Sequence, residues 1–133
     1  MNTLKVLLVD DYDRLRSSMA SYLSGQSGVE IVGEAANAID AVEQAGKLQP
    51  DLVLMDLDLP EGGGFEAMQE IKRRAPQTRV VILSPHGSEI YRRMAWRHAA
   101  DGFIDKGSIK RDLLAVIFSE QGRTGAGVLA ATA

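Results

Sequence analysis

The chain contains no cysteine among its 133 residues, which excludes disulfides, thiolate nucleophiles and cysteine-ligated zinc or iron–sulfur sites. Its two histidines, His86 and His98, are too few for a histidine-rich zinc site. No run of about 18 apolar residues is present, and the N-terminus lacks the apolar segment of a signal peptide. We therefore expect a reduced, cytoplasmic domain without a membrane partner, and the net charge of −3 argues against nucleic acid as the main partner.

Two kinds of apolar pattern alternate along the chain. Short runs rich in β-branched residues predict strands at 4–9, 29–32, 52–55, 80–83 and 103–104. The intervening segments carry apolar side chains at helical spacing, which predicts helices over 15–23, 39–48, 65–71, 90–98 and 109–117. Continuously apolar strands alternating with helices indicate a parallel sheet that is covered on both faces. We therefore predict an α/β fold, a doubly wound five-stranded parallel sheet of order 2-1-3-4-5 with five helices.

One domain accounts for nearly all of this pattern, over residues 1–120. The remaining segment 121–133, QGRTGAGVLAATA, carries three glycines and shows neither the apolar run of a strand nor the apolar spacing of a helix. It is interpreted as a flexible tail or as the start of a linker.

Polar residues follow four of the predicted strands. The first strand ends in Asp10 and Asp11, the third in Asp56 and the fourth in Ser84, and the fifth runs into Lys106. Because the carboxyl ends of parallel strands share one edge of the sheet, where open α/β sheets bind ligands, these side chains are expected to meet.

Carboxylates gathered at one edge repel each other, by roughly 4 kcal/mol for two charges about 4 Å apart at an effective dielectric near 20. An aspartate after a strand often caps the next helix, but Asp13 is available as the cap of the first helix. Oxygen ligands without histidine or cysteine suit a hard cation, magnesium in particular, with manganese as an alternative. With Lys106 as a fixed cation and Ser84 as a hydroxyl donor, the group is typical of a phosphoryl-transfer site.

Four segments resemble the receiver domain of bacterial response regulators, over about residues 4–120. They are VLLVDDYDRLR at 6–16, DLVLMDLDLPEGGGFE at 51–66, VVILSPHG at 80–87 and ADGFIDKGS at 100–108. Their order and spacing together make the resemblance highly specific, and it is closest to receivers that precede helix-turn-helix DNA-binding domains. The fold that the resemblance implies is flavodoxin-like, which agrees with the doubly wound sheet of order 2-1-3-4-5 predicted above.

The resemblance implies a phosphoacceptor and a metal site. Asp56 matches the aspartate that accepts the phosphoryl group from a sensor histidine kinase or a phosphotransfer protein. Asp10 and Asp11 match the acidic pair that holds Mg²⁺, together with Asp56 and the backbone carbonyl of Asp58.

The same resemblance implies a switch. Ser84 matches the hydroxyl residue that contacts the phosphoryl group, and Lys106 matches the lysine that pairs with it. Phe103 matches the aromatic residue whose rotation reports phosphorylation. The output face, which is also the expected face of a homodimer, would comprise the helix at 90–98, the strand at 103–104 and the helix at 109–117. No direct contact of this chain with nucleic acid is expected.

Several positions around the site are modulating candidates or depart from the family pattern. Pro85 replaces a residue whose backbone N–H donates to a phosphoryl oxygen in the family, and proline has no N–H. Asp58 and His86 are expected at the rim, where they would influence dephosphorylation. Gly107 replaces a proline that often follows the lysine, and Ala99 replaces a glycine that ends the fourth helix.

Two other functions fit part of the pattern. Asp56 and Asp58 have the Asp-x-Asp spacing of aspartate-nucleophile phosphatases, but in that family the motif follows the first strand, and here an acidic pair comes first. A receiver-like binding module that is never phosphorylated is the second alternative. The acidic pair, the phosphoacceptor aspartate, the hydroxyl residue and the lysine are all present in this sequence, and this argues against the second alternative.

Overall fold

The computed structural model of the chain describes residues 3–60, 63–85 and 89–118. The tail predicted at 121–133 and the rim residue His86 lie outside these ranges. Strands and helices alternate as predicted, and the bounds are β1 Leu4–Val9, α1 Asp13–Ser24, β2 Val29–Ala35, α2 Ala38–Leu48, β3 Leu52–Asp56, α3 Gly64–Arg74, β4 Arg79–Ser84, α4 Glu89–Arg97, β5 Gly102–Asp105, the 3₁₀ turn η1 Lys106–Ser108 and α5 Ile109–Ile117.

The five strands form one parallel sheet of order β2-β1-β3-β4-β5, which confirms the predicted topology. Its register aligns the carboxyl ends of the inner strands, with Val9 opposite Met55 and Asp56 opposite Leu83. Ser84 pairs with Asp105 at the same edge. The polar residues that follow these positions are therefore brought to one edge of the sheet.

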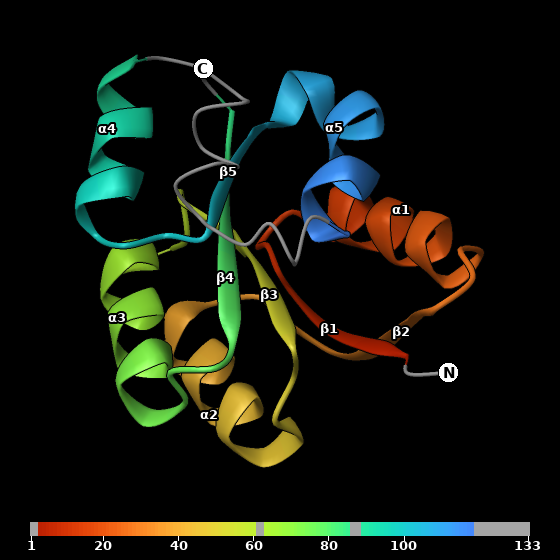
Figure 1. Cartoon of the computed structure of the whole chain (residues 1–133), viewed down its shortest axis with the longest axis horizontal. Helices are drawn as coiled ribbons and strands as arrows, with labels where there is room; N and C mark the ends of the chain where they lie inside the picture. The colour runs from red at the N-terminus through yellow and green to blue at the C-terminus, as the bar shows by residue number, and fades with distance from the viewer. Residues whose placement is uncertain (1–2, 61–62, 86–88, 119–133) are drawn as a thin grey trace.

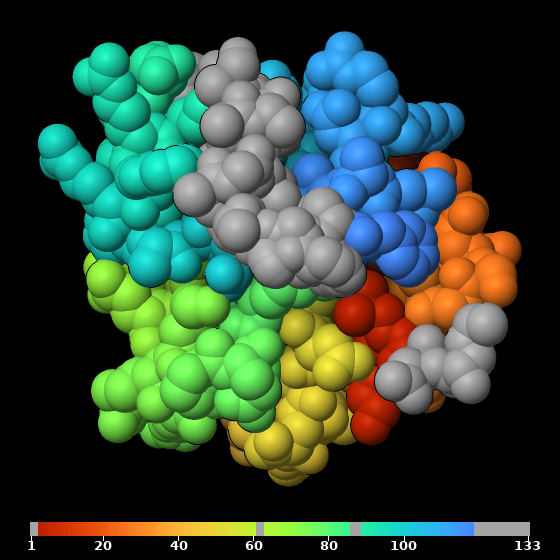
Figure 2. All heavy atoms as spheres, in the orientation of Figure 1, coloured from red at the N-terminus to blue at the C-terminus, as the bar shows by residue number. Residues whose placement is uncertain are grey.

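Helices cover both faces of the sheet, with α1 and α5 on one face and α2, α3 and α4 on the other (Figure 1). Figure 2 shows α1, in orange, beside α5, in blue, on the surface of the molecule. Successive residues of β1 enter different cores, Val6 and Leu8 beneath α1 and α5, Leu7 and Val9 beneath the other three helices. Burial on both faces explains why the strands are continuously apolar.

None of the described helices has the length and apolar character that a crossing of the bilayer requires.

Two local expectations are wrong. Tyr12, with an extended backbone, is the N-cap of α1, and Asp13 is the first helical residue, without a side-chain capping bond. The reason is that the Asp10 carboxylate already accepts the N–H of Tyr12, at 2.9 Å, which turns the chain before the helix begins. In α4 the apolar pattern predicted that Ile90 faces the core, but its side chain is 69% exposed, whereas Met94 packs against the core and Ala95 is buried.

The end of α4 has the backbone expected of a glycine. Ala99 has a φ of 63°, in the left-handed region, where an alanine costs about 1 kcal/mol. The N–H of the next residue, Ala100, closes the helix end by donating to the Ala95 carbonyl at 2.9 Å.

Gly64 brings the start of α3 against the end of β3. A Cβ atom at Gly64 would lie 2.9 Å from the carbonyl oxygen of Leu57 and 3.1 Å from that of Asp56. Both contacts are with backbone, so they cannot be relieved by a side-chain rotation. Glycine at this position therefore permits the close approach of α3 to the segment that carries Asp56.

We expect Gly64→Ala to destabilise the protein by about 1–3 kcal/mol, the usual range for overpacking in a tight interior. Gly46→Ala is the matched control, because Gly46 lies in α2 and a Cβ atom added there would meet nothing within 4 Å beyond its own helix backbone. Its expected effect is a gain of about 0.5–1 kcal/mol from helix propensity. Urea unfolding of both variants measures the difference, and equal effects would contradict the close approach inferred at Gly64.

Candidate functional site

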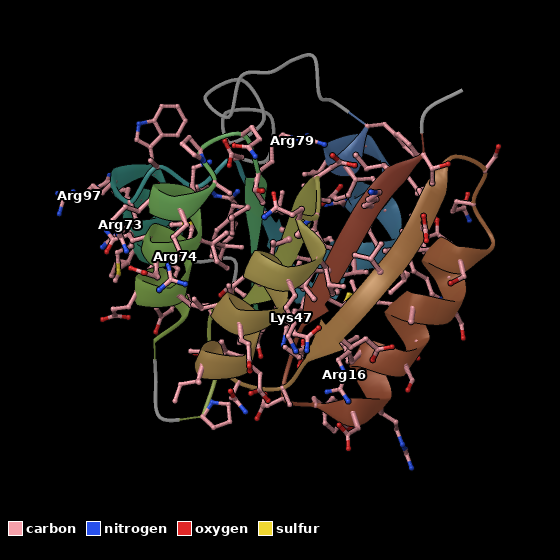
Figure 3. The ribbon with its side chains drawn as sticks, turned by 90° about the horizontal axis from the view of Figure 1, so that it is seen from below. Arg16, Lys47, Arg73, Arg74, Arg79 and Arg97 are labelled. Atoms are coloured by element: carbon pink, nitrogen blue, oxygen red, sulfur yellow. The ribbon has the colours of Figure 1, made fainter. Side chains whose placement is uncertain are left out.

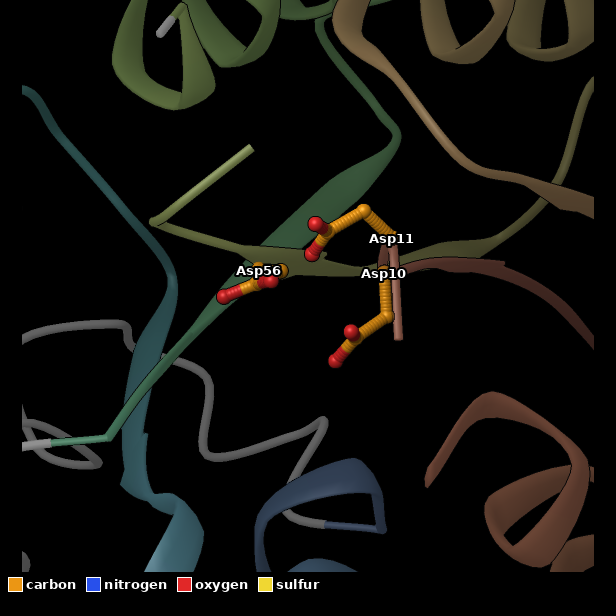
Figure 4. A group of neighbouring side chains, drawn as sticks. All are labelled: Asp10, Asp11 and Asp56. Carbon is orange, nitrogen blue, oxygen red and sulfur yellow. The ribbon is translucent and has the colours of Figure 1, made fainter. Parts of the chain in front are cut away.

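Three carboxylates meet at the carboxyl edge of the sheet, as the sequence predicted. Asp10 and Asp11 follow β1, and Asp56 is the last residue of β3. One carboxylate oxygen from each of the three lies within 4.8 Å of the others. Figure 4 shows the three side chains converging from two neighbouring strand ends.

Asp10 is fully buried and has an incompletely satisfied carboxylate. Its Oδ1 accepts the N–H of Tyr12, whereas Oδ2 accepts no hydrogen bond within the described part of the chain. Lys106 Nζ lies 3.0 Å from that Oδ2 as an ion-pair partner. A buried carboxylate oxygen in this state has capacity for a further cationic contact.

Asp56 is 1% exposed, and its Oδ1 has two contacts. The N–H of Asp58 donates to it at 3.1 Å, and Lys106 Nζ lies 3.1 Å away. Burial and the neighbouring charge of Asp10 raise the pKa of Asp56 to about 6, although Lys106 and the Asp58 N–H act in the opposite direction. Ionisation of Asp56 is therefore resisted in the absence of a further cation.

Lys106 places its ammonium between Asp10 and Asp56. Burial acts to lower the pKa of Lys106, but the two carboxylates outweigh it and hold the pKa above its ordinary value. The turn η1 holds the backbone here, with the Asp105 carboxylate accepting the N–H of Gly107 at 2.8 Å. The Lys106–Gly107 peptide bond is trans.

Ser84 and Pro85 lie at the same edge of the sheet, at the end of the neighbouring strand β4. Ser84 is the buried last residue of β4, and Pro85 is exposed. Asp58 has an exposed side chain and lies two residues beyond Asp56. The modulating role predicted for His86 falls outside the described residues.

Phe103 is fully buried in β5 and carries a contact that the sequence did not predict. The guanidinium carbon of Arg92, from α4, lies 4.8 Å from the centroid of the Phe103 ring. That distance is within the range of a cation–π interaction. No role for Arg92 followed from the sequence, because nothing in a helical pattern shows which arginine covers a ring on another element.

Arg16 is a second residue near the site to which the sequence assigned no role. Its guanidinium contacts the backbone of Asp10 as well as two carboxylates. Arg16 lies within the matching segment 6–16, but only the tertiary structure brings it to its partners, which are Asp10 after β1, Glu34 of β2 and Asp13 of α1.

The donor set fits a divalent cation with oxygen ligands. Asp10, Asp11 and Asp56 offer carboxylates at suitable mutual distances, and the buried Asp10 Oδ2 accepts no hydrogen bond among the described residues. Hard cations such as Mg²⁺ take such ligands and retain water or phosphate oxygens at their remaining positions. The site could therefore hold Mg²⁺, with one buried nucleophilic carboxylate and one ammonium beside it.

Asp56 should make the stability of the metal-free protein depend on pH. Its folded pKa of about 6 exceeds the unfolded value, so the folded state binds more protons and stability falls as pH rises from about 4 through 6. Asp56→Asn removes this loss, so its stability advantage should grow from near zero at pH 4 to as much as about 3 kcal/mol at pH 8. Thermal or urea unfolding in the presence of a chelator measures it.

Glu43→Gln, which removes an exposed carboxylate of α2, is the control for the loss of one negative charge. A stability advantage of Asp56→Asn that is the same at pH 5 and pH 8 would contradict the resisted ionisation.

Known proteins with similar sequences are response regulators. The model of the response regulator receiver domain matches residues 6–118. The response regulator protein VraR of Staphylococcus aureus is 41% identical over 113 residues, which is 84% of this chain and 53% of VraR. The chain thus spans about half the length of the curated relatives that it matches.

Solved structures agree with the sequence relatives. A two-component response regulator of the LuxR family from an Aurantimonas species has a TM-score of 0.87 and 29% identity, over 98% of this chain and 97% of that one. The signal receiver domain of NarL from Mycobacterium tuberculosis has a TM-score of 0.84 and 27% identity, over 92% and 100%. Since the family match runs from within β1 to the residue after α5, the chain belongs to the response regulator receiver domain family.

Proposed function

We propose that Asp56 accepts a phosphoryl group from the phosphohistidine of a sensor histidine kinase or a phosphotransfer protein. The observation that carries the proposal is a buried carboxylate, ion-paired with Lys106 and adjacent to two further carboxylates at an edge of the sheet. Membership of the receiver family supports the same chemistry. With this role goes the cytoplasmic location that is typical of response regulators.

The transfer exchanges one bond to phosphorus for another. An Asp56 carboxylate oxygen forms the new P–O bond as the P–N bond to the donor imidazole breaks, and the imidazole nitrogen leaves with the electron pair. Lys106 Nζ, 3.1 Å from Asp56 Oδ1, would offset negative charge on the phosphoryl oxygens. Because phosphoryl transfer depends mainly on positioning and charge, this arrangement suffices without a general base.

Mg²⁺ is the proposed cofactor, and Mn²⁺ would substitute for it. Asp10, Asp11, Asp56 and the backbone carbonyl of Asp58 would hold the ion. When bound, it would neutralise the carboxylates and the incoming phosphoryl oxygens.

Ser84 and Phe103 are proposed to relay the modification. Ser84 would contact the phosphoryl group and leave space into which Phe103 can move, so that two packings of one core form a switch. The contact of Arg92 with the Phe103 ring would change with that movement. The output face is α4, β5 and α5, and homodimerisation through it remains a prediction.

Transcriptional control is the proposed output. The similar VraR is about twice as long as the matched part of this chain, and a relative of known structure belongs to the LuxR family. We infer that the output resides in a further or separate domain and that this chain makes no direct contact with nucleic acid.

Incubation with acetyl phosphate and MgCl₂, followed by intact-mass measurement, should add the mass of one phosphoryl group to the wild-type chain. Asp56→Asn should gain none, because it lacks the nucleophilic oxygen. Asp51→Asn, which changes an exposed aspartate at the opposite end of β3, is the matched control and should be phosphorylated.

No gain by the wild type would favour the binding-module alternative. Equal gain by wild type and Asp56→Asn would assign the phosphoryl group elsewhere. Continuous turnover of phosphate monoesters would favour the phosphatase alternative.

Pro85 is expected to weaken retention of the phosphoryl group, because it offers no N–H beside Ser84. Pro85→Ala should bind beryllofluoride, a phosphoryl mimic, more tightly by about 1–3 kcal/mol, the contribution of a hydrogen bond to a charged group. Titration of both proteins in MgCl₂ measures the difference, with Pro76→Ala as a control at an exposed proline far from the site. Equal affinities would contradict the role assigned to Pro85.

A further inference from the structure

We propose that Arg16 is a positioning residue for the metal site, because it holds the backbone that carries Asp10 and Asp11. The inference rests on the proposed binding of Mg²⁺ and adds a residue to which neither the motif pattern nor the ligand set gives a role. Figure 3 shows Arg16 on α1, at the carboxyl end of the sheet.

The guanidinium of Arg16 joins three elements through three separate nitrogens. Nη1 donates to the backbone carbonyl of Asp10 at 2.7 Å, at the end of β1. Nε donates to Glu34 of β2 at 2.8 Å, and Nη2 donates to Asp13 of α1 at 2.7 Å. The planar fork of an arginine suits three partners in fixed directions, and the side chain is 17% exposed.

The contact between Arg16 and the Asp10 carbonyl holds the short segment that joins β1 to α1. This segment contains two of the three clustered carboxylates. The Asp10 N–H donates to the Ala35 carbonyl at 3.1 Å, which fixes the start of the segment against β2. At its far end α1 begins without a side-chain capping bond. The link from Arg16 to Asp10 and Asp13 therefore sets how the first turn of α1 lies relative to the strand end.

Geometry, and not charge, is the proposed contribution of Arg16. Its positive charge is matched by two carboxylates, those of Asp13 and Glu34, so little of it is available to the acidic cluster. The side chains of these two partners are 85% and 42% exposed, and ion pairs so accessible to solvent contribute little to stability. Loss of Arg16 should therefore affect the placement of Asp10 and Asp11 more than the folding of the domain.

The test is the Mg²⁺ affinity of Arg16→Met, obtained from the rise of Tm with MgCl₂ concentration. We expect a dissociation constant at least about 10-fold higher than that of the wild type, the usual effect of losing a residue that orients metal ligands. Arg14→Met is the matched control, because Arg14 is an exposed arginine of the same helix, and its affinity should equal the wild-type value. The Tm without metal reports the purely structural effect of each change.

Arg16→Lys separates geometry from charge and provides a second variant if Arg16→Met does not fold. A lysine keeps the charge but lacks the fork, so its affinity should fall nearly as far as that of Arg16→Met. Wild-type affinity in either folded variant would overturn the positioning role. A wild-type chain that shows no Mg²⁺ dependence would instead overturn the proposed metal site, so the two failures are distinguishable.

Discussion

The repulsion between buried carboxylates at one edge of the sheet is the constraint on which the rest of the site depends. Asp10 and Asp56 are almost completely removed from water, and the charge of Asp10 helps to raise the pKa of Asp56 to about 6. Lys106 lies 3.0–3.1 Å from both carboxylates and offsets part of this cost, yet Asp10 Oδ2 still accepts no hydrogen bond within the described residues. An edge with this imbalance favours any group that adds positive charge to it.

The surrounding fold holds these mutually repelling carboxylates in place. Two apolar cores, one on each face of the sheet, hold five strand ends in register without using a polar residue of the site. Gly64 allows α3 to approach the carbonyls of Asp56 and Leu57, and Arg16 joins the ends of β1 and β2 to the start of α1. Stability is thus concentrated in the cores, and the edge is left free to carry groups that destabilise the fold.

The proposed switch would connect the site at the strand ends with α4. β4 ends in Ser84, which lies beside β5. Within β5, the ring of Phe103 is covered by Arg92 from α4. The buried ring has no polar group of its own, so its position is determined by packing and by the cation above it. The proposed switch from Ser84 to Phe103 would thus end on a ring that α4 covers.

The sequence by itself determined the architecture and the members of the site. Five continuously apolar runs separated by helical patterns are compatible with few folds, and parallel strands necessarily bring Asp10, Asp56 and Lys106 to one edge. Only the tertiary structure decided that Tyr12 and not Asp13 caps α1, that Ile90 faces outward, and that Arg16 and Arg92 reach the backbone of Asp10 and the ring of Phe103. The physical reason is that periodicity specifies which residues share a face, whereas the rotation of a helix and the reach of a long side chain depend on the elements packed against it.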